Sequence, residues 1–187
     1  MKYEAVVIGG SAGGLDALEI ILTALPADFP GAVATVIHIS PDSDNYMVGY
    51  LDRRCRVTVQ EAEDKEMIQP GRVYMAPPNY HLLINTDRSL MLSAEPRVNY
   101  SRPAVDPLFE TAADAVGLRL IGVLLSGANQ DGSRGLRRIQ ENGGLTIVQS
   151  PETTRAPQMV QAARAACSVD HVLSPEAIGT LINRLFG

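Results

Sequence analysis

The 187-residue sequence is poor in cysteine and contains no long run of basic residues. Its two cysteines, Cys55 and Cys167, are alone and far apart, which excludes a disulfide framework and a zinc-knuckle spacing. The charge balance is 16 basic against 21 acidic residues, a net charge of −5. This balance argues against nucleic acid or an anionic membrane as the main partner.

Targeting and membrane-spanning segments are also missing from the sequence. The N-terminus lacks the basic-then-apolar pattern of a signal peptide, and no apolar run approaches the roughly 20 residues that span a bilayer. We therefore expect a cytoplasmic protein without membrane insertion. Hydrophobic residues make up 45% of the chain, and no repeat or low-complexity linker interrupts it. Residues 1–187 are predicted to form a single domain.

Short apolar runs alternate with segments of helical periodicity, which is typical of an α/β fold with a doubly wound, mostly parallel sheet and helices on both faces. Buried strands are expected at 4–8, 32–38, 120–125 and 145–149. Crossover helices are expected at 14–25, 105–116 and 133–144. The middle third, residues 54–96, alternates apolar and polar residues between turn signals, which predicts small antiparallel strands or hairpins attached to the main sheet.

The loop "VVIGGSAGG", residues 6–14, follows a predicted strand and begins a helix. Dinucleotide-binding loops and serine nucleophile elbows share this context. The dinucleotide pattern fits poorly, because the second strand ends in His38 where an acidic residue would hold the ribose. The segment Gly9–Gly13 matches G-x-S-x-G in full, so Ser11 is a candidate nucleophile. A serine that merely caps the helix remains an equal alternative.

A nucleophilic serine needs a base, and the chain offers three histidines. His81 and His171 lie in short strand-like runs and are interpreted as structural residues. His38 ends a predicted strand of the parallel sheet, at the edge where ligands bind. Because Ser11 also follows a strand end, His38 is the candidate base.

The histidine in turn needs a carboxylate that fixes its tautomer. The segment "LIGVLLSGANQDGSRG" brings Asp131 to the same edge of the sheet, although a simple "QDG" turn is an alternative interpretation. Asp42 and Asp44 are closer to His38 in sequence but are expected to cap the following helix. The predicted triad is therefore Ser11, His38 and Asp131.

With these residues in place, the sequence resembles the catalytic domain of the chemotaxis protein-glutamate methylesterases of the CheB type. The resemblance covers nearly the whole chain and rests on these segments, in the order and spacing of the family: "VVIGGSAGG", "VIHISP", "VQEAEDKEMIQPGRVYMAPPNYHLLI", "VNYSRPAVDPLFETAA", "GVLLSGANQDGSRGL" and "GGLTIVQS". It implies the same triad, with oxyanion donors at the backbone amides of Ala12 and Ala128. It also implies hydrolysis of glutamate methyl esters, or deamidation of glutamines, without a metal or an organic cofactor.

The resemblance further implies that the partner is a methylated chemoreceptor or a similar helical signalling protein. Arg102 and Met159 are candidate substrate-binding residues. The chain departs from the family at Ala12, at 127–129 and at 157–160, which bears on packing and substrate fit more than on the triad. Because the sequence begins directly with the first catalytic strand, regulation is expected to come from a separate protein or receiver domain. A non-catalytic binding module with the same fold is the main alternative, and a nucleotide-binding protein is the third.

Overall fold

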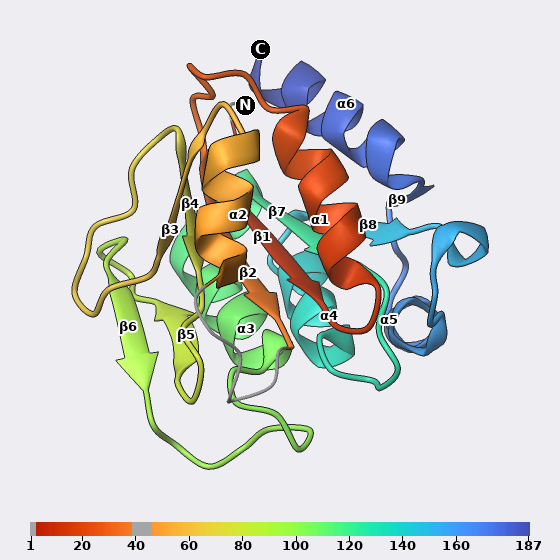
Figure 1. The fold of residues 1–187 in the computed structure, drawn as a ribbon. Helices are drawn as coiled ribbons and strands as arrows, with labels where there is room; N and C mark the ends of the chain where they lie inside the picture. The colour runs from red at the N-terminus through yellow and green to blue at the C-terminus, as the bar shows by residue number, and fades with distance from the viewer. Residues whose placement is uncertain (1–2, 39–45) are drawn as a thin grey trace.

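The computed structural model describes residues 3–38 and 46–187, which are built around a parallel β-sheet (Figure 1). Within these residues the sheet has seven strands in the order β3-β4-β2-β1-β7-β8-β9. The strands are β1 (Ala5–Gly10), β2 (Ala32–Ile37), β3 (Thr58–Glu61), β4 (Arg72–Met75), β7 (Leu120–Leu124), β8 (Leu145–Gln149) and β9 (His171–Leu173).

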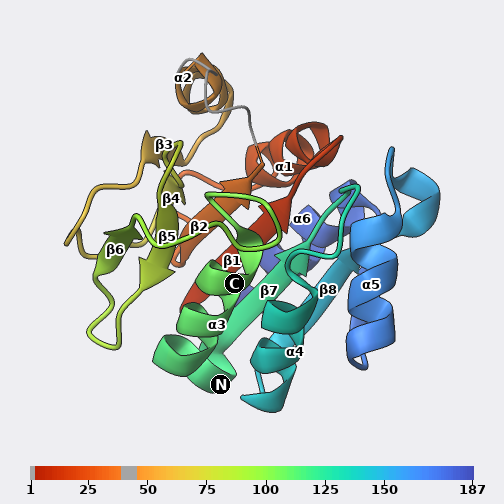
Figure 2. The ribbon, with the colours of Figure 1, turned by 90° about the horizontal axis from the view of Figure 1, so that it is seen from below.

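Helices cover both faces of the sheet, as Figure 2 shows from below. One face packs against α1 (Gly14–Thr23), α2 (Tyr46–Arg54) and α6 (Pro175–Phe186). The other face packs against α3 (Val105–Val116), α4 (Ser133–Glu141) and α5 (Gln158–Ala166). Two short 3₁₀ helices, η1 (Gly117–Arg119) and η2 (Pro151–Thr153), lie in the connections. None of the helices in the described ranges combines the length and apolar character needed to cross a bilayer.

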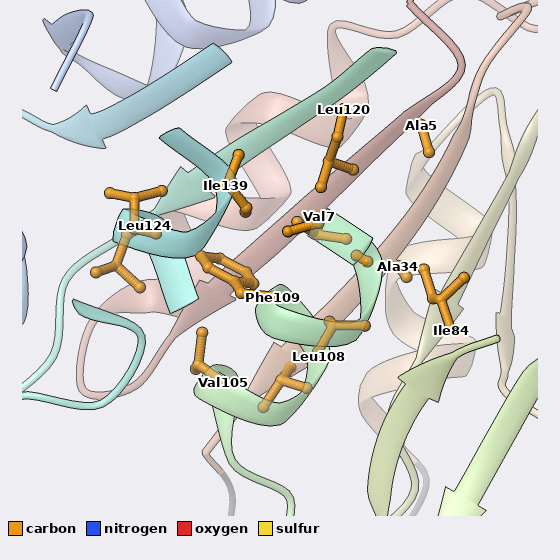
Figure 3. Packing of buried hydrophobic residues seen from close by; sticks show 14 of the residues in the cluster. Ala5, Val7, Ala34, Ile84, Val105, Leu108, Phe109, Leu120, Leu124 and Ile139 are labelled. Atoms are coloured by element: carbon orange, nitrogen blue, oxygen red, sulfur yellow. The ribbon is translucent and has the colours of Figure 1, made fainter. Parts of the chain in front are cut away.

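The central strand β1 is buried on both faces because its side chains alternate between the two helix layers. Val6 and Ile8 belong to the same buried cluster as Leu18 of α1. Val7 belongs to the opposite cluster, with Phe109 of α3 (Figure 3). Burying one such side chain stabilises the fold by roughly 1.5–3 kcal/mol, so a slip of one residue in β1 would be costly. The continuous apolar run in the sequence thus predicts a strand that is buried on both faces.

The expected α/β architecture is confirmed, and each strand and helix predicted outside the middle third is present within a few residues of its expected bounds. The expectation for the middle third is partly wrong. β3 and β4 are parallel members of the main sheet, paired with each other and, through β4, with β2. Only β5 (His81–Ile84) and β6 (Leu90–Ser93) form the antiparallel hairpin. β3 lies at the sheet edge, where polar side chains face solvent, so its alternation resembled that of an antiparallel strand.

The order of the strands reverses around β1, and this reversal locates the candidate site. The chain leaves β1 to build the β2 side of the sheet and later returns to place β7 on the other side of β1. Loops that follow β1 and β7 therefore diverge at the C-terminal ends of these strands. Ligands of open α/β sheets bind in the crevice at such a switch point.

Candidate active site

Three segments meet at the C-terminal ends of β2, β1 and β7. The N–H of His38 donates to the carbonyl of Gly10 at 3.0 Å, which extends the β1–β2 pairing by one residue. On the other side, the N–H of Ser11 donates to the carbonyl of Ser126 at 2.8 Å, beyond the end of β7. Ser11 therefore sits between the strand end that carries His38 and the loop that leads to Asp131. The predicted adjacency of these strands is confirmed.

The structure brings the side chains of His38 and Asp131 into direct contact. Nε2 of His38 lies 2.7 Å from Oδ2 of Asp131. The Asp131 side chain has no solvent exposure, and that of His38 is 11% exposed. A buried carboxylate needs compensating donors, and Asp131 has several. Its Oδ2 also accepts the N–H of Val105 at 2.6 Å, and its Oδ1 accepts the N–H of Asp106 at 3.1 Å and Nδ2 of Asn99 at 2.9 Å.

Asp131 also caps helix α3, although it lies in a different loop. The N-cap residue of α3, Ala104, has no side chain that could accept the first free N–H groups of the helix. Asp131 accepts those of Val105 and Asp106 instead. The partial positive charge at a helix N-terminus favours an anion at this position.

The protonation states of the pair follow from this environment. Burial alone would raise the pKa of Asp131, but the hydrogen bonds from His38, from the Val105 N–H and from Asn99 outweigh it and hold this pKa below its usual value. An ionised Asp131 can only accept, so Nε2 of His38 carries the hydrogen of the 2.7 Å contact. In the neutral ring, Nδ1 is then the nitrogen that can accept a proton.

Ser11 is partly exposed at the end of β1, and its hydroxyl makes no hydrogen bond to His38. Contacts between a nucleophile and its base are often long in a free enzyme and shorten when substrate binds. The arrangement therefore contains a formed His–Asp pair and a serine on the adjacent strand end.

The two predicted oxyanion donors lie on the loops that flank Ser11. Ala12 and Ala128 are exposed, and their N–H groups donate to no other group within residues 3–38 and 46–187. The two loops are in close contact, since a Cβ placed on Gly127 would lie only 3.1 Å from Cβ of Ser11. Free amides beside a serine hydroxyl are what an oxyanion hole requires.

A buried polar cluster connects these loops, and it was not predicted from the sequence. The hydroxyl of Ser126, which is fully buried, donates to the carbonyl of Ala12 at 2.6 Å and accepts the N–H of Ala156 at 3.1 Å. Its N–H donates to the side chain of Gln149 at 2.9 Å, and Gln149 in turn donates to the carbonyl of Thr153 at 2.9 Å. The cluster ties the loops after β1, β7 and β8 together. Its only sequence signal is a polar residue at the end of each apolar strand.

Asn99 and Asp106 form a second supporting group that was also missed. Nδ2 of Asn99 bridges the two buried carboxylates, at 2.9 Å from Oδ1 of Asp131 and 3.0 Å from Oδ2 of Asp106. Asp106 accepts the N–H of Gly135, in the first turn of α4, at 2.8 Å. Burial raises the pKa of Asp106, the Gly135 N–H opposes this, and the nearby charge of Asp131 adds to the rise. Both residues lie in the segment "VNYSRPAVD", where only Arg102 was singled out.

The two predicted substrate-binding residues make contacts with other parts of the protein. Arg102 donates through Nη1 to the carbonyls of Ala94 and Glu95, at 2.8 and 3.0 Å. Met159 is fully buried, and a Cβ on Gly127 would come within 2.5 Å of its Cε. Met159 therefore packs against the loop that contains Gly127 and has no exposed surface that a substrate could contact. The sequence could not show this, because the burial and these contacts depend on which segments pack together in the fold.

The other candidates have structural positions. His81 is 2% exposed, donates through Nε2 to the carbonyl of Pro96 at 3.1 Å and accepts the N–H of Ala104 at Nδ1. His171 begins the edge strand β9. Both placements fit the structural interpretation. Asp42 and Asp44 lie outside the described residues.

Packing explains the first glycine of the "GGSAGG" loop. A Cβ on Gly9 would lie 2.2 Å from Cγ1 of Val105, so only glycine lets the N-terminus of α3 approach β1. The same approach brings the N–H of Val105 to Asp131. At Gly13 the φ of 77° is in the left-handed region, which glycine tolerates.

Among the described residues no group of three or more His, Cys, Asp or Glu side chains is placed to hold a metal ion.

Comparison with known proteins finds similarity over nearly the whole chain. The model of the CheB methylesterase family matches residues 6–182. A protein of Leptospira interrogans named putative protein-glutamate methylesterase/protein-glutamine glutaminase is 50% identical over 185 residues, which cover 99% of this chain and 96% of the relative. A protein-glutamate methylesterase/protein-glutamine glutaminase of Anaeromyxobacter dehalogenans is 39% identical over 98% of this chain and 54% of the relative. The chain thus spans about half the length of several relatives that it matches.

The fold also matches a solved structure. The crystal structure of the Thermotoga maritima CheB methylesterase catalytic domain superposes with a TM-score of 0.94 at 32% sequence identity. The match covers 99% of this chain and 100% of the other.

Proposed function

The chain belongs to the CheB methylesterase family, and we propose that Ser11, His38 and Asp131 are the triad with which it hydrolyses glutamate methyl esters on chemoreceptors. As a protein-glutamate methylesterase it is a carboxylic ester hydrolase. The observation that carries the triad proposal is the 2.7 Å contact of His38 Nε2 with a fully buried Asp131. With the Nε2 hydrogen directed to Asp131, Nδ1 is the ring nitrogen that can act as a base.

The first half of the reaction forms an acyl-enzyme. Oγ of Ser11 attacks the ester carbonyl while Nδ1 of His38 takes the hydroxyl proton. The imidazolium that forms continues to donate its Nε2–H to Asp131. The lowered pKa of Asp131 keeps this carboxyl group ionised. The negative charge on the carbonyl oxygen is met by the N–H groups of Ala12 and Ala128. The tetrahedral intermediate then breaks the bond to the methoxy oxygen, His38 returns the proton, and methanol leaves.

The second half repeats these steps with water. His38 takes a proton from water, the hydroxide attacks the acyl carbon, and the same two N–H groups hold the oxyanion. Ser11 leaves with the proton from His38, and a free glutamate carboxyl group is released. Acid–base catalysis of this kind contributes roughly 10²–10⁴ in rate, and each oxyanion donor roughly 10²–10³.

A glutamine side chain fits the same route. Its amide carbonyl would accept Ser11 in the same way, and His38 would protonate the departing ammonia. The acyl-enzyme is identical for both substrates, so deamidation needs no further residue. The relatives named above carry both activities in their names.

The proposal is tested by the release of methanol from a methylated receptor. The signalling domain of a chemoreceptor, labelled at its methyl groups, is incubated with the purified chain. Ser11→Ala should abolish release, whereas Ser168→Ala, a matched change at an exposed serine outside the site, should leave it unchanged. A chain that binds the receptor domain but releases no methanol would be a non-catalytic binding module, and the proposal would be wrong.

A further inference from the structure

The segment that carries Asn99 makes a tight turn with an unusual residue at its tip. Val98 and Ser101 exchange two backbone hydrogen bonds, at 3.1 and 2.9 Å. Between them, Asn99 and Tyr100 have φ values of 48° and 65°. Turns with positive φ at both central positions strongly favour Asn followed by Gly. Here tyrosine stands at the glycine position.

Folding does not explain this tyrosine. A residue with a Cβ in the left-handed region is strained, and bulky residues are rare there. The side chain recovers almost nothing through burial, because Tyr100 is 95% exposed. Strain of this kind persists where the surrounding structure imposes it, and it gathers at functional sites.

The surrounding structure does hold this turn firmly. The side chain of Asn99 donates to Asp131 at 2.9 Å and to Asp106 at 3.0 Å. The turn is thereby fastened to the same carboxylate that contacts His38. The backbone of Tyr100 consequently has a fixed position relative to the proposed triad, while its ring projects into solvent. A turn whose backbone is held in place before binding loses little further backbone freedom when its side chain makes a contact.

A surface pocket of about 370 Å³ lies beside the ring. Its lining consists of Asn99, Tyr100, Asn129, Gln130 and Gln158. Asn129 follows the proposed oxyanion donor Ala128, and its side chain accepts the N–H of Asp131 at 3.0 Å. The pocket therefore borders the reacting centre. Its lining is uncharged, with carboxamides that both donate and accept, which suits neutral side chains and peptide groups.

We infer that Tyr100 is a recognition residue, whose ring packs against an uncharged side chain of the protein segment that carries the ester. The inference rests on the proposed function, because the segment is that of the methylated receptor. Exposed tyrosines are efficient contact residues, since they provide a large rigid surface with few rotatable bonds. The neighbouring amides of Asn129, Gln130 and Gln158 would bind polar groups of the same segment.

The test compares a protein substrate with a small ester in Tyr100→Gly. Relief of backbone strain should raise the melting temperature of this variant by roughly 2–4 °C. Its kcat/KM for the methyl-labelled receptor domain should fall at least about tenfold, the loss expected for an aromatic interface residue. Its kcat/KM for p-nitrophenyl acetate should stay within about twofold of wild type. Tyr100→Phe should retain both activities, since the ring makes the contact.

Leu118→Ala provides the control, because it removes an exposed apolar side chain just before β7, at the opposite end of the sheet. This variant should hydrolyse both substrates like wild type. An unchanged rate on the receptor domain in Tyr100→Gly, or equal losses on both substrates, would overturn the inference. A wild-type chain that hydrolyses neither substrate would instead show that the proposed function is wrong. The inference about Tyr100 would then be wrong as well.

Discussion

Replacing Asn99 by glycine tests whether the buried carboxylates depend on a shared donor. Asn99 is the side chain that bridges Asp131 and Asp106, at 2.9 and 3.0 Å. Glycine removes the amide and adds no strain, because Asn99 has a φ of 48°. The two carboxylates, which are 0% and 3% exposed, would then face each other without a donor between them.

The size of the effect follows from these contacts. A hydrogen bond to a charged group stabilises a protein by roughly 1.5–3 kcal/mol. Asn99 makes two such bonds, but it is itself partly exposed, so water can replace part of the loss. We expect the free energy of unfolding of Asn99→Gly to be lower by about 2–4 kcal/mol at pH 7. Asp131 keeps the N–H groups of Val105 and Asp106, so kcat should fall only about tenfold.

The loss should also depend on pH. Asn99 lowers the pKa of both carboxyl groups in the folded chain, so removing it raises both folded-state values. Groups with lower folded-state pKa values contribute stability at higher pH and lose it as pH falls. The deficit of Asn99→Gly should therefore be largest near neutral pH and shrink as the pH falls towards about 4, the usual carboxyl range.

Urea unfolding of the variant and wild type between neutral and acidic pH measures both quantities. Asn79→Gly is the matched control, since Asn79 also has a positive φ, of 66°, and lies exposed in a turn. Its unfolding free energy should change by less than about 0.5 kcal/mol. If Asn99→Gly behaves like this control, or loses the same stability at every pH, Asn99 serves only the turn and the reasoning is refuted.

Three further results are expected. Ser11→Ala and His38→Ala should each lower kcat by at least about 10³, and the double variant should be scarcely worse; additive losses in steady-state assays would show that the two residues act separately. Asp131→Asn should lower the unfolding free energy by roughly 3–5 kcal/mol at neutral pH. Because the folded-state pKa of Asp131 is lowered, its contribution is present above about pH 4 and disappears below it, so a pH-independent deficit in urea unfolding would contradict the assignment. Gly9→Ala should destabilise the protein by roughly 1–3 kcal/mol through its clash with Val105, and adding Val105→Ala should recover part of this in thermal unfolding, whereas summed losses would speak against the clash.

Local patterns in the sequence predicted the elements with the strongest periodicity. Buried parallel strands such as β1 and β2 are continuous apolar runs, and α3 has its apolar residues three and four apart. Such elements are recognised because nearly all their side chains obey one period. β3 and β4 were harder, because four-residue strands carry little pattern and their direction depends on the strand they pair with.

The supporting residues of the site could not be predicted in this way. Asn99 precedes its partner Asp131 by 32 residues, and Ser126 lies 114 residues from Ala12, whose carbonyl it holds. Each is an ordinary polar residue in a turn or at a strand end. What makes each important is a hydrogen-bond partner on a distant segment, and local sequence patterns do not reveal that partner.

The sequence alone determined the α/β fold and the three strand ends that carry Ser11, His38 and Asp131, because apolar runs form parallel strands whose C-terminal ends share one edge. Tertiary structure decided how these residues are used. It buried Asp131 at the N-terminus of α3, where hydrogen bonds from His38 and from N–H groups of that distant helix keep the carboxylate ionised. It also turned Nε2 of His38 towards that carboxylate, buried Met159 and directed Arg102 to the backbone carbonyls of Ala94 and Glu95. Hydrogen bonds and burial depend on which segments approach each other, and only the packed chain settles that.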